Sequence, residues 1–228
     1  MSHARSYDDP CGIARGLDVV GERWALLVVR ELVFSAKRFN DLRRGLGGVS
    51  PNVLSQRLAD LEGHGVIERR VAGPPVGATV YALTASGQQL VPVLDALARW
   101  GSRLPIRSER PLSRDALMLA MQTSVSPNAE IKPGLRITLD GSDWDPVVSH
   151  GVLEWRPPMG MAEATLTTSA ATLHRLVFRG LDLADTLATG EVTVLGDLSL
   201  APAFLAAFAP SAARQPQQEF RGATPSAG

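Results

Sequence analysis

Residues 50–65, SPNVLSQRLADLEGHG, have the chemistry to read the edges of DNA bases if they form a helix. At about 100° per residue, one side of that helix is apolar and carries Leu54, Leu58 and Leu61. Asn52 and Gln56 fall on almost the opposite side, with Ser55 beside them. Amide side chains can make paired hydrogen bonds to adenine, so this polar face predicts direct contact with bases.

Cationic and capping residues surround this polar face. Ser50 is the predicted N-cap, with Pro51 at the first helical position, and Arg57 on the flank of the helix can reach guanine or a phosphate. Further side chains placed as phosphate contacts are Lys37, Arg38, Arg43, Arg44, Arg69 and Arg70. The alternative is a solvated, arginine-rich surface on a purely structural helical bundle. Net charge favours DNA, because residues 1–110 hold 15 basic and 11 acidic side chains.

The elements that must position these residues follow a recognisable order. Apolar spacing predicts helices within residues 10–48, including the nearly all-apolar WALLVVREL at 24–32 and a short amphipathic helix at 38–46. Two strands, 66–71 and 79–83, form a hairpin, and a last helix begins near Thr84 or Ser86 and bends at Pro92. A helix, a glycine-containing turn, a second helix and a hairpin predict a winged helix-turn-helix.

Residues 11–100 resemble the HxlR-type winged-helix transcription regulators. The resemblance lies in a cysteine that opens the first helix, then GERWALLVVREL, KRFNDLRRGLGGVSPNVLSQRLADLEGHGVIERR and YALTASGQQLVPVLDALARWG. It implies a homodimer, formed by the first and last helices of this segment, that binds an inverted repeat in double-stranded DNA. One departure is at the wing tip, where Val76 and Gly77 follow Pro74 and Pro75 in place of the family's usual basic residue.

Cys11 is the only cysteine, so an intrachain disulfide and a cysteine zinc site are excluded. A cap at Asp9 would place the thiol at the start of a helix, where the helix dipole favours thiolate. In part of the resembling family this position senses oxidants or electrophiles. Asp8 and Asp9 oppose thiolate formation, and a small buried apolar role is the alternative reading.

The pattern changes after a proline-containing linker at residues 105–112. A helix at 114–121 precedes predicted strands at 135–139, 147–155 and 161–168. Helices at 169–179 and 182–189, a strand at 191–195 and a helix at 200–208 follow. We therefore predict an α+β protein of two domains, 1–104 and 113–209, the second with helices on one face of its sheet, and a disordered tail at 210–228.

The second half shows no pattern typical of catalysis. Its histidines are isolated, and nucleophile-elbow, phosphate-loop and dinucleotide-binding motifs are missing. Asp140, Asp143 and Asp145 match a calcium loop poorly, because its glycine and distal glutamate are misplaced. We predict no catalytic residues, no metal and no cofactor, and we read LDGSDWDP as a solvated turn. An enzyme with a nucleic-acid tether is therefore disfavoured.

Residues 113–209 instead resemble the sterol carrier protein lipid-binding fold. The similarity is in AEATLTTSAATLHRLVFRG, DLADTLATG and EVTVLGDLSLAPAFLAAF. It implies a tunnel between sheet and helices that holds an apolar ligand. The predicted lining consists of Met118, Met121, Trp144, Trp155, Met159, Met161, Leu187, Phe204 and Phe208. Plain hydrophobic core is the alternative for each of these side chains.

These expectations combine into a dimeric transcription regulator with a hydrophobic effector in its second domain. The alternative is the same regulator with an inert C-terminal scaffold and redox or electrophile sensing at Cys11. No apolar run reaches the length of a membrane helix, and the start, MSHARSYDDP, lacks an apolar signal core. We expect a cytoplasmic protein without a membrane partner.

Overall fold

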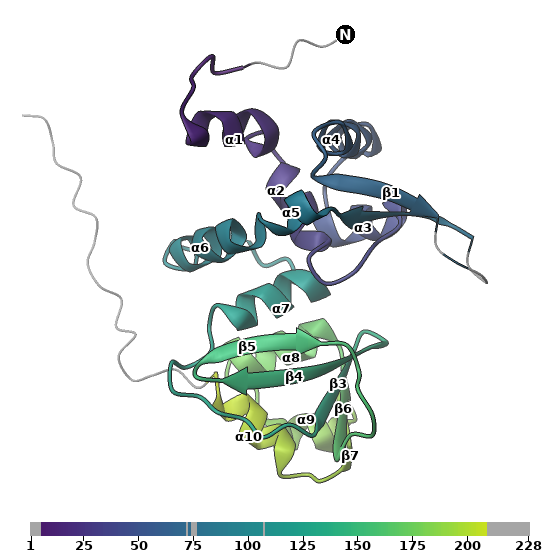
Figure 1. Cartoon of the computed structure of the whole chain (residues 1–228). Helices are drawn as coiled ribbons and strands as arrows, with labels where there is room; N and C mark the ends of the chain where they lie inside the picture. The colour runs from purple at the N-terminus through teal and green to yellow at the C-terminus, as the bar shows by residue number, and fades with distance from the viewer. Residues whose placement is uncertain (1–5, 72, 74–76, 107, 209–228) are drawn as a thin grey trace, which may run out of the picture.

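The computed structural model describes residues 6–71, 73, 77–106 and 108–208. Their buried apolar side chains form two clusters, one in each half of the chain. The upper half in Figure 1 contains helices and a two-stranded hairpin, and the lower half contains a five-stranded sheet with helices. The predicted tail at 210–228 and most of the wing tip lie outside the described residues.

Four helices build the core of the N-terminal half. They are α1 (Gly12–Val20), α2 (Ala25–Glu31), α3 (Phe39–Leu46) and α4 (Pro51–Gly63). The apolar segment WALLVVREL was predicted to be central, and Val28, Val29 and Leu32 are indeed buried. They pack with the leucines of α3 and α4, so α2 lies against both helices of the helix-turn-helix.

The wing is the antiparallel hairpin of β1 (Ile67–Val71) and β2 (Thr79–Leu83). It is tied to the helices through Lys37 and Tyr81, whose backbones exchange two hydrogen bonds of 2.9 and 2.8 Å. The predicted bend in the last helix is a break between α5 (Ala85–Gln88) and α6 (Val91–Gly101). Pro92 lies in the first turn of α6, where its missing N–H costs no helical hydrogen bond.

The C-terminal half begins with α7 (Arg114–Gln122) and continues into a mixed sheet of order β5-β4-β3-β6-β7. Its strands are β3 (Leu135–Leu139), β4 (Ser142–Ser149), β5 (Val152–Arg156), β6 (Ala164–Thr168) and β7 (Val192–Gly196). The parallel pair is β3 with β6, and the other neighbours are antiparallel. The remaining helices are α8 (Ala170–Phe178), α9 (Leu183–Thr189) and α10 (Leu200–Ala206), and α8 and α9 lie behind strands of the sheet in Figure 1.

The prediction of one strand over residues 147–155 is wrong. The chain turns at His150 and Gly151, whose φ angles are +51° and +72°, so β4 and β5 form a hairpin. Two positive φ angles match the right-handed twist of the flanking strands. Asp140 and Gly141 make the same kind of turn between β3 and β4, so only these two residues of the predicted solvated turn connect the strands.

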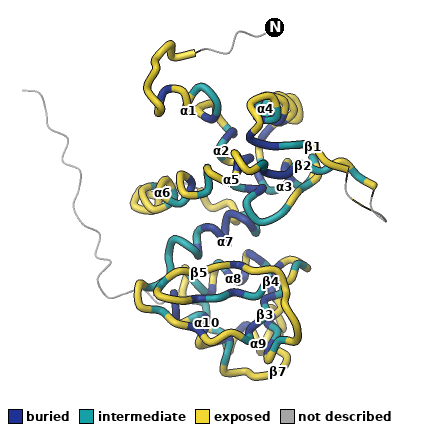
Figure 2. Tube along the Cα trace, in the orientation of Figure 1, coloured by how far each residue is buried: buried dark blue, intermediate teal, exposed yellow. Residues whose placement is uncertain are grey.

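Helix α7 joins the two halves. Its Leu119 packs in the N-terminal cluster, whereas Leu117, Met118 and Met121 pack in the C-terminal cluster. Figure 2 shows α7 as a mostly buried helix between the hairpin half and the sheet half. Among the described residues, no helix has the length and apolar content needed to cross a membrane.

Candidate DNA-binding surface

The turn between α3 and α4 is held by two glycines and a serine cap. Gly47 and Gly48 have φ angles of +46° and +89°, which side-chain-bearing residues rarely adopt. Ser50 Oγ accepts a hydrogen bond from the Val53 amide, as predicted for an N-cap. Leu54, Leu58 and Leu61 are fully buried, so α4 presents its opposite side to solvent.

The exposed side of α4 carries Asn52, Ser55 and Gln56, together with Val53 and Ala59. Gln56 Nε2 donates a 2.7 Å hydrogen bond to Asp60 Oδ1 on the next turn. This bond is exposed and within one helix, so the amide can exchange it for a base edge at little cost. Sequence reasoning missed the part that Asp60 plays in holding Gln56, although their spacing of four residues is a signal for it.

Arg57 does not belong to this exposed face. Its side chain is largely buried and forms a 3.0 Å ion pair with Asp60 and a 3.9 Å contact with Glu22. The contact of Arg57 with DNA therefore stays a prediction, made by a side chain that already pairs with carboxylates. The guanidinium holds α4 to the loop that connects α1 with α2.

Lys37 is not available as the phosphate contact that the sequence predicted. Its ammonium lies 2.9 Å from Glu31 Oε2 and 2.7 Å from Asp115 Oδ2, and both carboxylates are almost completely buried. An ammonium enclosed by two carboxylates has no free charge to offer to a phosphate. Asp115 lies 78 residues further along the chain, so local spacing cannot reveal its pairing with Lys37.

The pKa values of Glu31 and Asp115 are shifted in opposite directions. Burial acts to raise the pKa of Glu31, but Lys37, Arg30 and the Ser113 hydroxyl outweigh it and the pKa ends lower than usual. Burial raises the pKa of Asp115, and its partners do not compensate. The charge of Glu31 raises the pKa of Asp115 further, and Asp115 Oδ1 is buried without a partner among the described residues.

This asymmetry predicts opposite effects on acid stability. The contribution of Glu31 is present above its unfolded pKa, ordinarily 4.5, and is lost as pH falls through the lower folded pKa. The contribution of Asp115 has the other sign, because its raised pKa favours the protonated folded form. We expect the free energy of unfolding in urea to fall less steeply between about pH 5 and pH 3 in Glu31→Gln and more steeply in Asp115→Asn. Equal slopes in the two variants would contradict this assignment.

Other arginines remain available near the exposed face of α4. Arg38, the N-cap residue of α3, and Arg43 are exposed and have no ion-pair partner within the part of the chain that the structure describes. Arg44 is exposed too, but it pairs with Asp41 at 3.1 Å. These side chains mark the α3 side of the surface as cationic.

The wing places its two arginines on opposite sides of β1. Arg69 contacts Glu62 at 3.3 Å and lies over the Tyr81 ring, whereas Arg70 pairs with Glu68. Both are exposed. Because neighbouring residues of a strand point to opposite faces, the pair cannot serve one DNA surface together.

Cys11 is exposed at the start of α1, which contradicts the buried apolar reading. It occupies the N-cap position, and its backbone amide donates to Asp9 Oδ1 at 2.8 Å. Within the described residues, no three His, Cys, Asp or Glu side chains group as a metal site would require.

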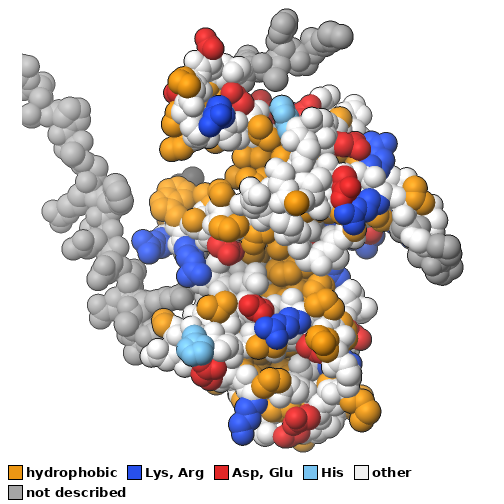
Figure 3. All heavy atoms as spheres, viewed as in Figure 1, with side chains coloured by type: hydrophobic (Ala, Val, Ile, Leu, Met, Phe, Trp, Pro, Cys, Tyr) orange, Lys and Arg blue, Asp and Glu red, His pale blue; other side chains and the backbone are white. Residues whose placement is uncertain are grey.

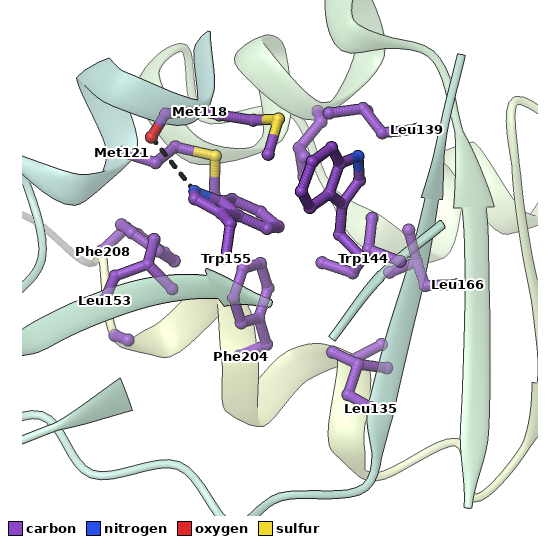
Figure 4. Packing of buried hydrophobic residues seen from close by; sticks show 14 of the residues in the cluster. Met118, Met121, Leu135, Leu139, Trp144, Leu153, Trp155, Leu166, Phe204 and Phe208 are labelled. Atoms are coloured by element: carbon purple, nitrogen blue, oxygen red, sulfur yellow. Dashed lines mark hydrogen bonds between the residues drawn. The ribbon is translucent and has the colours of Figure 1, made fainter. Parts of the chain in front are cut away.

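The nine predicted pocket residues do not surround one cavity. Six are buried in the packed C-terminal core: Met118, Met121, Trp144, Trp155, Phe204 and Phe208. Figure 4 shows these side chains against one another, with Trp155 Nε1 donating to the Met118 carbonyl at 3.1 Å. Leu187, Met159 and Met161 are exposed, Met161 almost completely, because their segments lie outside this core. Membership of these three in one internal tunnel is therefore corrected.

A separate pocket of about 350 Å3 lies beside the two exposed methionines. Its walls come from the start of β3, the middle of β4 and the connection from β5 to β6. Asp145 in its wall is already paired with Arg136 at 2.8 Å and accepts from the Met159 amide, and these bonds lower its pKa.

Comparison with known proteins matches residues 19–108 to the HxlR-like helix-turn-helix family. The chain is 33% identical over 88 residues to the HTH-type transcriptional regulator YvaP of Bacillus subtilis, covering 39% of this chain and 82% of YvaP. It is 38% identical over 92 residues to the regulator sll1512 of Synechocystis sp., covering 40% of this chain and 68% of sll1512. Among solved structures, the oxidized form of the redox regulator HypR is 29% identical, with a TM-score of 0.38 over 42% of this chain and 99% of HypR. The chain belongs to the HxlR-like helix-turn-helix family.

Proposed function

We propose that this protein is a dimeric transcription regulator that reads an inverted repeat in double-stranded DNA through α4. The observation that carries the proposal is the division of α4 into a buried leucine side and an exposed polar side. Asn52, Ser55 and Gln56 are the proposed base contacts, Ser50 holds the start of the helix, and Arg38 and Arg43 are the proposed phosphate contacts. Either Arg69 or Arg70 can join them from the wing.

The base contact and the phosphate contact should respond differently to substitution. We expect Gln56→Ala to weaken binding to the cognate duplex by roughly 1–3 kcal/mol and to relax preference at one base pair. Arg38→Ala should weaken binding to all duplexes alike and lower the salt slope by about 1. The measurement is fluorescence anisotropy on duplexes selected from genomic fragments, at several salt concentrations.

Arg156→Ala is the matched control, because Arg156 is an exposed arginine on the sheet, far from α4 in the sequence. It should leave both the affinity and the salt slope unchanged. Wild-type binding by both test variants would contradict the assignment of α4.

The proposed dimer uses the apolar side chains that α1 and α6 expose. They are Ile13, Leu17, Val93, Leu97 and Trp100. Leu94 of α6, by contrast, is buried within the monomer. Figure 3 shows hydrophobic side chains bordering the hollow between these two helices. Burying such a patch against a second copy would remove it from water.

Sedimentation velocity tests this assembly. We expect a dimer at micromolar concentration and a monomer for Ile13→Asp combined with Trp100→Asp, because two buried charges would oppose association. Val152→Asp, at an exposed position of the sheet, is the control and should stay dimeric. A wild-type monomer both free and on DNA would contradict the dimer.

For the second domain we propose a sterol-carrier-like scaffold. Its mixed sheet with helices on one face supports the resemblance, and the direct packing of six predicted pocket residues favours a scaffold over a tunnel. A hydrophobic effector is the alternative, with the pocket beside Met159 and Met161 as its place. Sensing at Cys11 is a further alternative that its exposure favours.

Native mass spectrometry with a panel of apolar compounds distinguishes a scaffold from an effector domain. The scaffold proposal expects no stoichiometric complex and no compound-dependent change in DNA affinity. A complex that also shifts the DNA affinity would indicate an effector domain and not a scaffold. A ligand shifts the balance between free and DNA-bound protein only if it binds these two states with different affinity.

A further inference from the structure

Residues 110–115, here called the junction segment, lie between the helix-turn-helix and the sheet. They begin two residues after the end of the family-matched segment 19–108. The side chains of Arg110, Ser113 and Asp115 reach back to the helix-turn-helix, and Arg114 also reaches the loop before α3. The segment therefore adds contacts that come from outside the family-matched part of the chain.

Arg110 holds the turn between α3 and α4. Its Nη1 donates a 2.8 Å hydrogen bond to the carbonyl oxygen of Gly47. The guanidinium lies so close to the turn that a Cβ built on Gly47 would be 2.6 Å from Arg110 Nη2. Since Gly47 and Gly48 set the direction in which α4 leaves α3, Arg110 is placed to fix that direction.

Ser113 and Asp115 hold the elements at the other end of α3. Ser113 Oγ donates to Glu31 Oε1 at 2.6 Å, and Lys37 Nζ donates to Asp115 Oδ2 at 2.7 Å. Lys37 immediately precedes the N-cap residue Arg38, and its backbone pairs with Tyr81 of the wing. The junction segment thus touches α2, the start of α3 and the turn before α4.

Arg114 links the same place to the sheet. Its Nη1 donates to Ser142 at the start of β4, and its Nη2 lies 3.4 Å from the Ser35 hydroxyl in the loop before α3. Beside it, Phe34 of that loop makes an edge contact with the Trp144 ring of β4, with centroids 5.9 Å apart. The C-terminal half is therefore docked on the helix-turn-helix by polar and aromatic contacts.

We propose that Arg110, Ser113 and Asp115 are positioning residues for DNA reading, and that docking of the second domain sets the orientation of α4. The inference rests on the proposed DNA contact by α4. It gives the C-terminal half a part in DNA recognition that does not need a ligand.

Arg110 offers the sharpest test, because it is exposed and its replacement leaves both hydrophobic cores intact. Arg110→Gln keeps a hydrogen-bond donor without the charge, and Arg110→Met removes both. In the full chain, we expect Arg110→Met to lower the ratio of specific to non-specific DNA affinity by about tenfold, and Arg110→Gln, whose amide ends two bonds short of Nη1, to recover only part of it. The salt slope should be the same in all three proteins.

Hydrogen exchange provides a readout that does not depend on DNA. Arg110→Met should lower the protection of amides in residues 47–54 and leave those of β3 unchanged. If both variants lose affinity for every duplex equally and the salt slope falls by about 1, Arg110 is a phosphate contact and the proposal is overturned. Unchanged exchange at 47–54 would overturn it as well. A wild-type protein that binds no duplex would refute the proposed function. Hydrogen exchange would still test whether Arg110 stabilises the turn between α3 and α4.

Discussion

Lys37→Met is expected to lower the free energy of unfolding by about 3–5 kcal/mol, the cost of leaving buried charges without their partner. Glu31 and Asp115 are almost completely excluded from water and both use the Lys37 ammonium. Methionine fills a similar volume but neutralises neither carboxylate. Urea denaturation of the full chain measures the loss. A loss below about 0.5 kcal/mol would instead be typical of an exposed surface lysine.

Arg38→Met is the matched control, since Arg38 is the next residue, is exposed and has no ion-pair partner in the described part of the chain. Its free energy of unfolding should change by less than about 0.5 kcal/mol. Its DNA affinity should fall although its stability does not, because a phosphate contact affects binding and not folding. The pair therefore separates a structural cation from a phosphate contact at neighbouring positions.

Phe204→Ala is expected to cost about 3–5 kcal/mol of stability. The Phe204 side chain is fully buried, and its ring makes edge contacts with Trp155 at 6.1 Å and with Phe208 at 5.2 Å between centroids. Truncation would leave a cavity that these rings cannot close. If Phe204 instead lined an open tunnel, its loss would remove little packing.

The control for Phe204 is Leu195→Ala, because Leu195 is an apolar residue that β7 exposes to solvent. It should change stability by less than about 0.5 kcal/mol. Urea denaturation of both variants decides between a packed core and an open tunnel. A cost below about 1 kcal/mol for Phe204→Ala would contradict the packed core.

Local sequence patterns predicted α4 well. Ser50, Pro51 and the leucines at 54, 58 and 61 each act through neighbours within a few residues, so periodicity and capping suffice to locate α4. The hairpin and the break near Pro92 are likewise local. Figure 1 shows these elements in the predicted order.

The roles of Lys37 and Arg57 could not be read in this way. A lysine beside an arginine before a helix is typical of a phosphate-binding surface, and only the fold brings Asp115 to it from 78 residues away. One signal was present, because Glu31 is the only acidic residue of α2, whose other residues except Arg30 are apolar, and a buried carboxylate needs partners. Arg110 gave no signal, since its acceptor is a backbone carbonyl.

The exposure of three predicted pocket residues in the second half has a different reason. The predicted lining residues were chosen for their apolar side chains and the resemblance to a lipid-binding fold. Which of them face the core depends on the register of each strand, which these criteria do not give. The turn at His150 and Gly151 places Leu153 and Trp155 inside, whereas the connection carrying Met159 and Met161 runs outside. Composition alone does not distinguish these two environments.

Disulfide cross-linking to DNA tests the contact by α4 most directly. In a Cys11→Ser background, the full chain would carry either Gln56→Cys or Thr193→Cys and meet a selected duplex that bears a thiol tether on a base in the major groove. Thr193 is exposed on β7 and serves as the control. We expect a cross-link at position 56, at one register of the duplex, and none at position 193. Cross-linking at 193 without cross-linking at 56 would contradict it.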